Sequence, residues 1–367
     1  MNNSFNINSN RIIGFDVLRS LAILIVIYNH GQIILNQVIA TPYFEIVDGV
    51  DLFFVLSGFL IGNIILKTFN RDYIRTLTLL GFWIRRWFRT IPNYLLAILS
   101  SLIVAYLFTN TIGEFNWKYL FFIQNFNMKH PSFLPQAWSL SVEECFYFAF
   151  PLILSFIINL TKFSFNKKYL ITVFLFLIIP LAFRAKDAFL YNSVINNEIL
   201  DIYFRKKTLL RLDSIGYGLL GAYLKLKLKN QWKTKRYFFI VLSVVIYICN
   251  HFYLNNTNLN NCVFRFSLDS LSILFILPFF NFIKIHNELL KKIIVLISTI
   301  SYSMYLFHFD VILWPILECF NLSSIFTNII AYTCYWLITI LISYLIYKVY
   351  ENKMTKIRDH NYFKKFY

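Results

Sequence analysis

Long apolar stretches separated by short polar segments run along the whole chain. A helix needs roughly 20 apolar residues to cross about 30 Å of hydrocarbon, and ten stretches approach that length. They are 12–34, 49–67, 91–109, 138–159, 169–184, 209–224, 237–254, 266–283, 293–315 and 325–347. The shorter apolar segment 117–126 is expected to be interfacial or re-entrant. The pattern predicts an all-α polytopic membrane protein, with one membrane domain over residues 1–350 and a short basic tail over 351–367.

The composition supports a membrane protein and excludes an ordinary soluble one. Only 14% of the residues are charged and 58% are hydrophobic, whereas an average globular chain is about 25% charged. The net charge of +17 would favour nucleic-acid binding in a soluble domain, but no polar stretch is long enough to form one. The 35 Lys and Arg residues instead fall mainly in alternate connections between the predicted spans. Such connections are cytoplasmic in most membrane proteins, so both termini are predicted to be cytoplasmic.

One connection departs from this distribution. The predicted outer segment 184–211 is strongly basic. Either it has a function on the outer side, or the boundaries of the spans on either side of it are wrong.

Several common sites are not indicated by the sequence. The five cysteines lie far apart with no CxxC pair, so we expect neither a disulfide framework nor a metal site. A GxGxxG match at Gly216, Gly218 and Gly221 follows no strand and lies in an apolar stretch, where helix packing explains it better than dinucleotide binding. The first apolar stretch has no cleavage site, which indicates a retained helix.

Two ionisable residues within the first apolar stretch are candidates for function. A charged side chain in hydrocarbon costs about 2.5–3.5 kcal/mol on insertion scales. Arg19 and His30 are eleven residues apart, which places them on one helix face with a rise of about 16 Å between them. Arg19 then lies in the inner half of the span and His30 near its outer end. The alternative is that both are buried polar groups paired with Asp16 or with carboxylates of other helices.

Polar residues of later spans extend this set of candidates. Asp51 opens the second stretch level with His30, and we hypothesise that its carboxylate orients the imidazole. Ser57, Gly58 and Gly62 of the same stretch suit close helix packing. Three further candidates, in the sixth and ninth stretches, are Arg211, Tyr302 and His308.

A basic cluster precedes the third apolar stretch. Arg85, Arg86 and Arg89 lie in an amphipathic segment that is expected to be cytoplasmic and to end at Pro92. Such a cluster either anchors the chain at the interface or binds phosphates, for which the guanidinium fork is suited. Coenzyme A would be such a phosphate ligand.

Adjacent carboxylates mark the start of the fourth apolar stretch. Ser139, Glu143 and Tyr147 share one helix face. We therefore expect Glu143 to point inward and Glu144 to face a neighbouring helix or the interface. A purely structural role for the inward carboxylate is the alternative.

Six motifs in order resemble those of the membrane acyltransferase family 3. They are FDVLRSLAILIVIYNH, GVDLFFVLSGFLI, RRWFRTIP, QAWSLSVEECFYFAFP, RLDSIGYGLLGA and SYSMYLFHF, and the resemblance runs from about residue 11 to residue 345. It implies a ten-helix enzyme of the bacterial cytoplasmic membrane that moves an acyl group, often acetyl, from cytoplasmic acyl-CoA to a hydroxyl of a cell-surface polysaccharide or lipopolysaccharide sugar. No bound cofactor is implied beyond this donor substrate. Many relatives carry an extracytoplasmic hydrolase-like domain, which is expected to be absent here.

The resemblance also assigns roles to the candidate residues. Arg19, His30 and Glu143 become the catalytic candidates. The chemistry agrees, because an alcohol needs a general base to attack a thioester at neutral pH, and His30 can supply one. Asp51 or Glu143 could fix its tautomer, and a covalent acyl-histidine is an alternative to direct transfer. Residues expected to contact the substrates are Arg85, Arg86, Arg89, Asp51, Ser57, Trp138, Arg211, Tyr302 and His308.

A transporter or flippase is the competing class of protein. In that case Arg19, His30 and Glu143 would form a proton or anion path. The two classes differ in one observable, because only the enzyme transfers label from acetyl-CoA to an acceptor.

Overall fold

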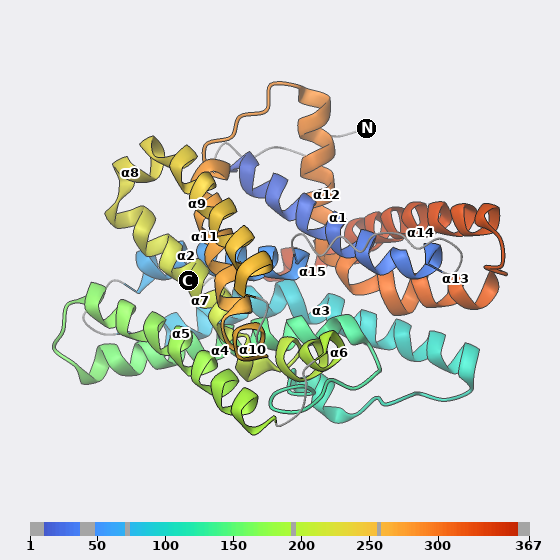
Figure 1. Cartoon of the computed structure of the whole chain (residues 1–367), viewed down its shortest axis with the longest axis horizontal. Coiled ribbons are helices and arrows are strands. Elements are labelled where there is room, and N and C mark those ends of the chain that lie inside the picture. Colours follow the sequence, from blue (N-terminus) through green and yellow to red (C-terminus); the bar gives the residue numbers. More distant parts are fainter. Residues whose placement is uncertain (1–10, 37–47, 70–73, 192–195, 255–257, 359–367) are drawn as a thin grey trace.

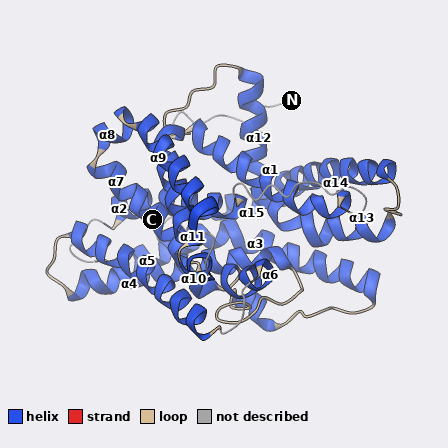
Figure 2. Cartoon of the chain, in the orientation of Figure 1, coloured by secondary structure: helices blue, strands red, loops and turns tan. Residues whose placement is uncertain are grey.

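The computed structural model describes residues 11–36, 48–69, 74–191, 196–254 and 258–358, and within these ranges the secondary structure is helical with no strand (Figures 1 and 2). The all-α prediction is confirmed. Within the described ranges, seven helices have the length and composition to cross a membrane. Their bounds are α1 Ile13–Leu35, α2 Gly49–Thr68, α3 Thr76–Thr109, α4 Trp138–Leu160, α5 Phe165–Leu190, α12 Glu288–Phe307 with its continuation to Cys319, and α14 Ile325–Ile346.

The three remaining predicted spans coincide with shorter helices. They are α7 Leu212–Lys227, α9 Arg236–Ile248 and α11 Arg265–Phe280. A helix of 16 residues such as α7 is about 24 Å long, which is less than the hydrocarbon thickness. Short connecting helices are α6 Asn197–Ile199, α8 Lys229–Thr234, α10 Asn258–Val263, α13 Trp314–Cys319 and α15 Asn352–Arg358.

The third span is longer than the sequence indicated. α3 contains 34 residues with Pro92 in its interior, so the expectation of a separate basic segment ending at Pro92 is wrong. A helix of this length rises about 51 Å, which exceeds the membrane thickness and lets its first turns project beyond the hydrocarbon. Arg85, Arg86 and Arg89 therefore belong to the membrane helix itself.

Helix α2 packs against α1, α7 and α11, and α12 and α14 lie beside α1 (Figure 1). Glycines make the α2–α7 contact possible. A Cβ atom added at Gly58 would lie 2.1 Å from the carbonyl oxygen of Ile215, and one added at Gly218 would lie 2.1 Å from that of Val55. The interpretation of these glycines as packing residues is confirmed.

The basic segment 184–211 is partly helix and partly a structured loop. Arg184 lies in α5, where its side chain is fully buried and bonds Asp213 at 2.7 Å. The boundary predicted for this span was therefore wrong. The later part of the segment is held against the loop after α3, since the backbone N–H of Thr208 donates to the carbonyl of Asn125 at 3.0 Å. Segment 117–126 contains only a short helical turn, η1 Trp117–Phe121, as expected of a non-spanning segment.

The chain continues as helix across residue 350. The turn η7 Tyr347–Glu351 connects α14 to α15. The carboxylate of Glu351, assigned to the tail from sequence, accepts hydrogen bonds from Asn93 at 2.7 Å and from Ser303 at 2.6 Å. Residues 1–10 and 359–367 lie outside the described residues, so the side on which the termini lie stays a prediction.

The close α2–α7 contact predicts different effects for two equal substitutions. Gly58→Ala places a methyl group against backbone, whereas Gly216→Ala meets the flexible side chain of Leu177 at 3.1 Å. Overpacking costs about 1–3 kcal/mol, so Gly58→Ala should lower the melting temperature of the detergent-solubilised protein by several degrees more than Gly216→Ala. Equal melting temperatures for the two variants would contradict the packing described here.

Candidate active site

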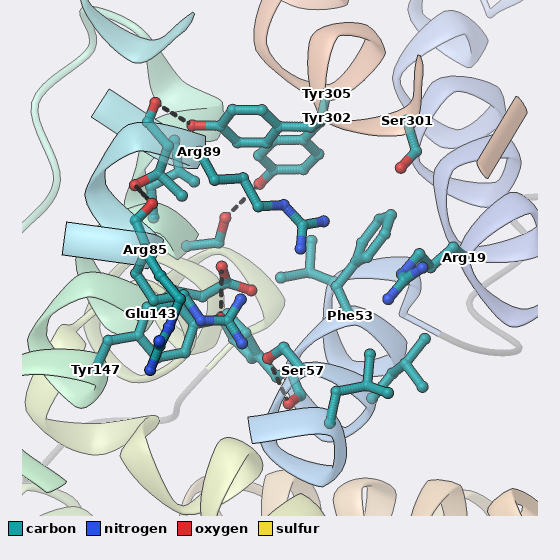
Figure 3. Close-up of a pocket in the computed structure, with 18 of the residues that line it drawn as sticks. Arg19, Phe53, Ser57, Arg85, Arg89, Glu143, Tyr147, Ser301, Tyr302 and Tyr305 are labelled. Atoms are coloured by element: carbon teal, nitrogen blue, oxygen red, sulfur yellow. Dashed lines mark hydrogen bonds between the residues drawn. The ribbon is translucent and has the colours of Figure 1, made fainter. Parts of the chain in front are cut away.

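A cavity of about 480 Å³ lies between α1, α2, α3, α4 and α12 (Figure 3). This volume is within the roughly 300–1,000 Å³ range of small-molecule sites. Much of its wall is apolar and aromatic, including Phe53, Phe54 and Leu60. We call it the inner cavity, because Arg19 lies in the half of α1 that is predicted to be cytoplasmic.

The inner cavity is strongly cationic. Arg19, Arg85, Arg86 and Arg89 line it, and Glu143 is the only carboxylate among the described residues of its wall. In Figure 3 the side chains of Arg19 and Arg89 extend from opposite sides toward the space around Phe53. This excess of positive charge in a site of low dielectric favours an anionic ligand.

The glutamate is bonded to Tyr147 within the inner cavity. The hydroxyl of Tyr147 donates to Oε2 of Glu143 at 3.2 Å, and Cζ of Arg86 lies 5.1 Å from the centre of the Tyr147 ring. Among the described residues, neither Arg86 nor Arg89 forms an ion pair within 4.0 Å. Their guanidinium groups therefore keep their hydrogen-bonding capacity for a ligand.

Arg19 has a partner of its own. Its Nη1 lies 3.5 Å from Oδ1 of Asp16, and Asp16 is also bound by Arg11 and Ser298. The pairing with Asp16 weighed from sequence is therefore present. Arg19 nevertheless contributes to the wall of the inner cavity, so its positive charge can act on a ligand there.

Hydroxyl groups complete the inner wall as expected from sequence. Ser139, Glu143 and Tyr147 all face the inner cavity from α4, and Ser57 faces it from α2. The hydroxyl of Tyr302 lines it too and donates to the carbonyl of Thr90 at 2.8 Å.

His30 is bonded to a second histidine. Its Nδ1 lies 2.7 Å from Nε2 of His308. The other nitrogen of His308, Nδ1, lies 2.8 Å from the carbonyl oxygen of Tyr305 and 3.1 Å from that of Met304. A carbonyl only accepts hydrogen bonds, so for neutral rings Nδ1 of His308 carries the proton and its Nε2 is an acceptor. His30 must then donate from Nδ1, which leaves its Nε2 with a free lone pair.

The hypothesis that Asp51 orients His30 is wrong. The carboxylate of Asp51 forms an ion pair with Arg211 instead, and Glu143 interacts with Tyr147. Arg211 is fully buried and its Cζ lies 4.2 Å from the ring centre of Phe266. It is not among the residues that line the inner cavity.

Aromatic side chains occupy the space beyond the inner cavity. Tyr305 lines the cavity, and its ring centre lies 6.0 Å from that of His308. Trp138 is buried and contacts Phe54 edge-on at 5.8 Å. Neither His30 nor Trp138 is among the described residues that line the inner cavity. Tyr305 therefore lies between the inner cavity and the histidine pair.

The sequence did not reveal the histidine pair or the position of Tyr305. His308 was a candidate only as a substrate contact, and nothing in its local pattern indicates which helix it faces. Glu144 is buried away from the inner cavity, as expected for the second carboxylate.

Fold and site together define a polytopic membrane protein with a cationic cavity on one side and a paired histidine beyond it. A family model described as an acyltransferase domain matches residues 12–348. The chain belongs to the acyltransferase 3 family.

Relatives agree with this assignment. An inferred O-acetyltransferase of Staphylococcus aureus (strain COL) is 31% identical over 333 residues, which cover 82% of this chain and 50% of the relative. The peptidoglycan O-acetyltransferase OatA of Listeria monocytogenes is 35% identical over 175 residues, 43% of this chain and 26% of the relative. The chain spans about half the length of the Staphylococcus relatives it matches. No solved structure matches the chain.

The inner cavity predicts a pattern of thiol reactivity in a variant whose five cysteines are replaced by alanine. Ser57→Cys places a thiol in the cationic cavity, whereas Ser101→Cys places one in α3 at a buried position outside it. An anionic, membrane-impermeant thiosulfonate should label the first at least about tenfold faster, because the positive field concentrates it. Labelling should occur in inverted membrane vesicles and not in sealed right-side-out vesicles. Equal labelling of both positions, or labelling from the outer side, would contradict the assignment.

Proposed function

We propose that this chain is a membrane O-acetyltransferase that uses cytoplasmic acetyl-CoA as donor. The acceptor is a hydroxyl group of a cell-surface polysaccharide or lipopolysaccharide sugar. The observation that carries the proposal is the combination of a cationic cavity with a histidine whose Nε2 is left free as a base. Membership of the acyltransferase 3 family supports the reaction class.

The inner cavity suits coenzyme A in both parts of its chemistry. Arg85, Arg86 and Arg89 offer guanidinium forks, which bind phosphate oxygens in pairs. The apolar wall around Phe53 and Phe54 suits the uncharged arm that carries the thioester. Arg19 is placed to attract the thioester carbonyl or a phosphate.

His30 is the general base of the proposed reaction. Its Nε2 takes the proton of the acceptor hydroxyl as the hydroxyl oxygen attacks the thioester carbonyl carbon. The carbon–sulfur bond then breaks, and the proton passes to the coenzyme A thiolate. The products are the acetyl ester and free coenzyme A, and the histidine regains its neutral state.

The aromatic wall serves the same chemistry. Tyr305 lines the donor cavity beside His308, and Trp138 is buried against Phe54. Both side chains keep water away from the thioester until an acceptor is present. Transfer requires these side chains to move or the acetyl group to pass through a covalent acyl-histidine.

Removing the base should abolish most of the turnover. A positioned general base contributes about 10²- to 10⁴-fold, so His30→Ala should lower the rate by that order. The assay is acceptor-dependent transfer from labelled acetyl-CoA in inverted membrane vesicles of the producing cell, with the amount of inserted protein measured in parallel. Full activity in His30→Ala would end the proposal, and solute flux without acetyl transfer would favour a transporter.

The histidine pair predicts a graded response at residue 308. His308→Gln keeps an amide oxygen that can accept from Nδ1 of His30, whereas His308→Leu removes the acceptor and leaves either tautomer free to form. We expect His308→Leu to lower kcat by about 10²-fold and His308→Gln by about tenfold or less, given what a positioned base contributes. The KM for acetyl-CoA should stay unchanged in both, because neither residue contacts the donor cavity. Equal kcat values in the two variants would show that tautomer control is not the role of His308.

A further inference from the structure

A second cavity of about 460 Å³ lies where the C-terminal half of α1 meets the first turn of α2. Residues of α6, α9 and α11 also line it, as do residues of the turns η3 Leu200–Arg205 and η5 Cys249–Leu254. Asn29 lines it, ten residues along α1 from Arg19 of the inner cavity, which corresponds to a rise of about 15 Å. We call it the outer cavity.

The charges of the outer cavity are largely paired with one another. Arg205 lies 2.5 Å from the carboxylate of Asp48 and 2.8 Å from that of Asp201, and Asp51 pairs with buried Arg211. Burial raises the pKa of Asp201, but the Arg205 and Lys206 cations outweigh this and hold its pKa below the ordinary value. The carboxylate of Asp201 is therefore ionised at neutral pH and held in position by Arg205.

The residual charge of the wall disfavours an anionic ligand. Carboxylates outnumber guanidinium groups, because Asp48, Asp51, Glu198, Asp201 and Asp269 stand against Arg205 and Arg265. An ionised carboxylate only accepts hydrogen bonds. The wall therefore suits a neutral ligand with many hydroxyl donors, in contrast to the cationic inner cavity.

Flat apolar surfaces accompany these acceptors. The rings of Tyr247 and His251 are stacked with centres 4.1 Å apart, and Phe266 and Ile273 also line the cavity. A sugar ring presents hydroxyl groups around its edge and an apolar C–H face, so it can use both kinds of contact at once. Pockets that combine an apolar surface with a few fixed polar groups are typical of specific ligand sites.

The outer cavity also adjoins the proposed base. Arg205 and Asp201 interact electrostatically with His30, and Cζ of Arg205 lies 5.1 Å from the ring centre of buried Trp138. Oδ1 of Asn29 is buried and accepts no hydrogen bond from any described residue. This oxygen belongs to the residue next to His30 and is available to a hydroxyl donor.

We propose that the outer cavity binds the acceptor as a neutral, hydroxyl-rich sugar ring. Carboxylates such as Asp201 and Asp269 accept its hydroxyl hydrogens, Tyr247 packs against its C–H face, and the reacting hydroxyl lies toward Asn29. The inference rests on the proposed function for the direction of the reacting group, whereas binding itself does not depend on turnover.

The test measures binding to the purified full chain by isothermal titration calorimetry. The probes are neutral trisaccharides of glucose, N-acetylglucosamine, mannose or galactose, with trigalacturonic acid as the anionic counterpart of equal size. At least one neutral trisaccharide should bind, with a Kd at least about tenfold lower than the Kd of trigalacturonic acid. Tyr247→Ala and Asp269→Asn should each weaken this binding at least about tenfold, with the Kd for acetyl-CoA unchanged.

The matched control is Glu318→Gln, which removes an exposed carboxylate on α13 outside the cavity and should leave sugar binding as in the parent chain. Binding of none of the neutral sugars, preference for the anion, or unchanged binding in both cavity variants would overturn the inference. Two assays separate its failure from that of the proposed function. Sugar binding without acetyl transfer would contradict the proposed function and support this site. Acetyl transfer that is unchanged in Tyr247→Ala and Asp269→Asn would contradict this site and support the proposed function.

Discussion

The structure depends on one constraint, which is that an ionised side chain inside the membrane needs a partner. Burying an unpaired charge costs several kcal/mol, and the buried ion pairs of this chain meet that requirement. Arg184 pairs with Asp213, and Arg211 pairs with Asp51. These pairs join α5 to α7 and α7 to α2. The exceptions identify the site, because Arg86 and Arg89 form no ion pair with described residues and face a cavity instead.

Partners also fix the positions of the protons in the histidine pair. Two carbonyl groups fix the tautomer of His308, and this in turn fixes the donor atom of His30. In many hydrolases a carboxylate performs this orientation. A neutral imidazole performs it here without placing a further negative charge in the membrane, where burial would be costly.

The sequence predicted the helices well because membrane thickness limits their length and hydropathy reports it directly. It also predicted most of the inner wall, since Arg19, Ser57 and Glu143 stand out as polar residues in apolar stretches. It failed where partners come from distant helices. Nothing local to Asp51 indicates that α7 brings Arg211 to it. The outer cavity was missed because its wall is assembled from five separate segments of the chain, although the basic segment 184–211, which contains Arg205, stood out in the charge distribution.

The central claim is that donor and acceptor enter from opposite sides of the membrane. It is tested most directly by supplying labelled acetyl-CoA, which does not cross membranes, to sealed vesicles of defined orientation from the producing cell. The account predicts labelled surface glycan in inverted vesicles, where the inner cavity faces the medium, and none in sealed right-side-out vesicles until they are permeabilised. Equal labelling in sealed vesicles of both orientations would contradict it.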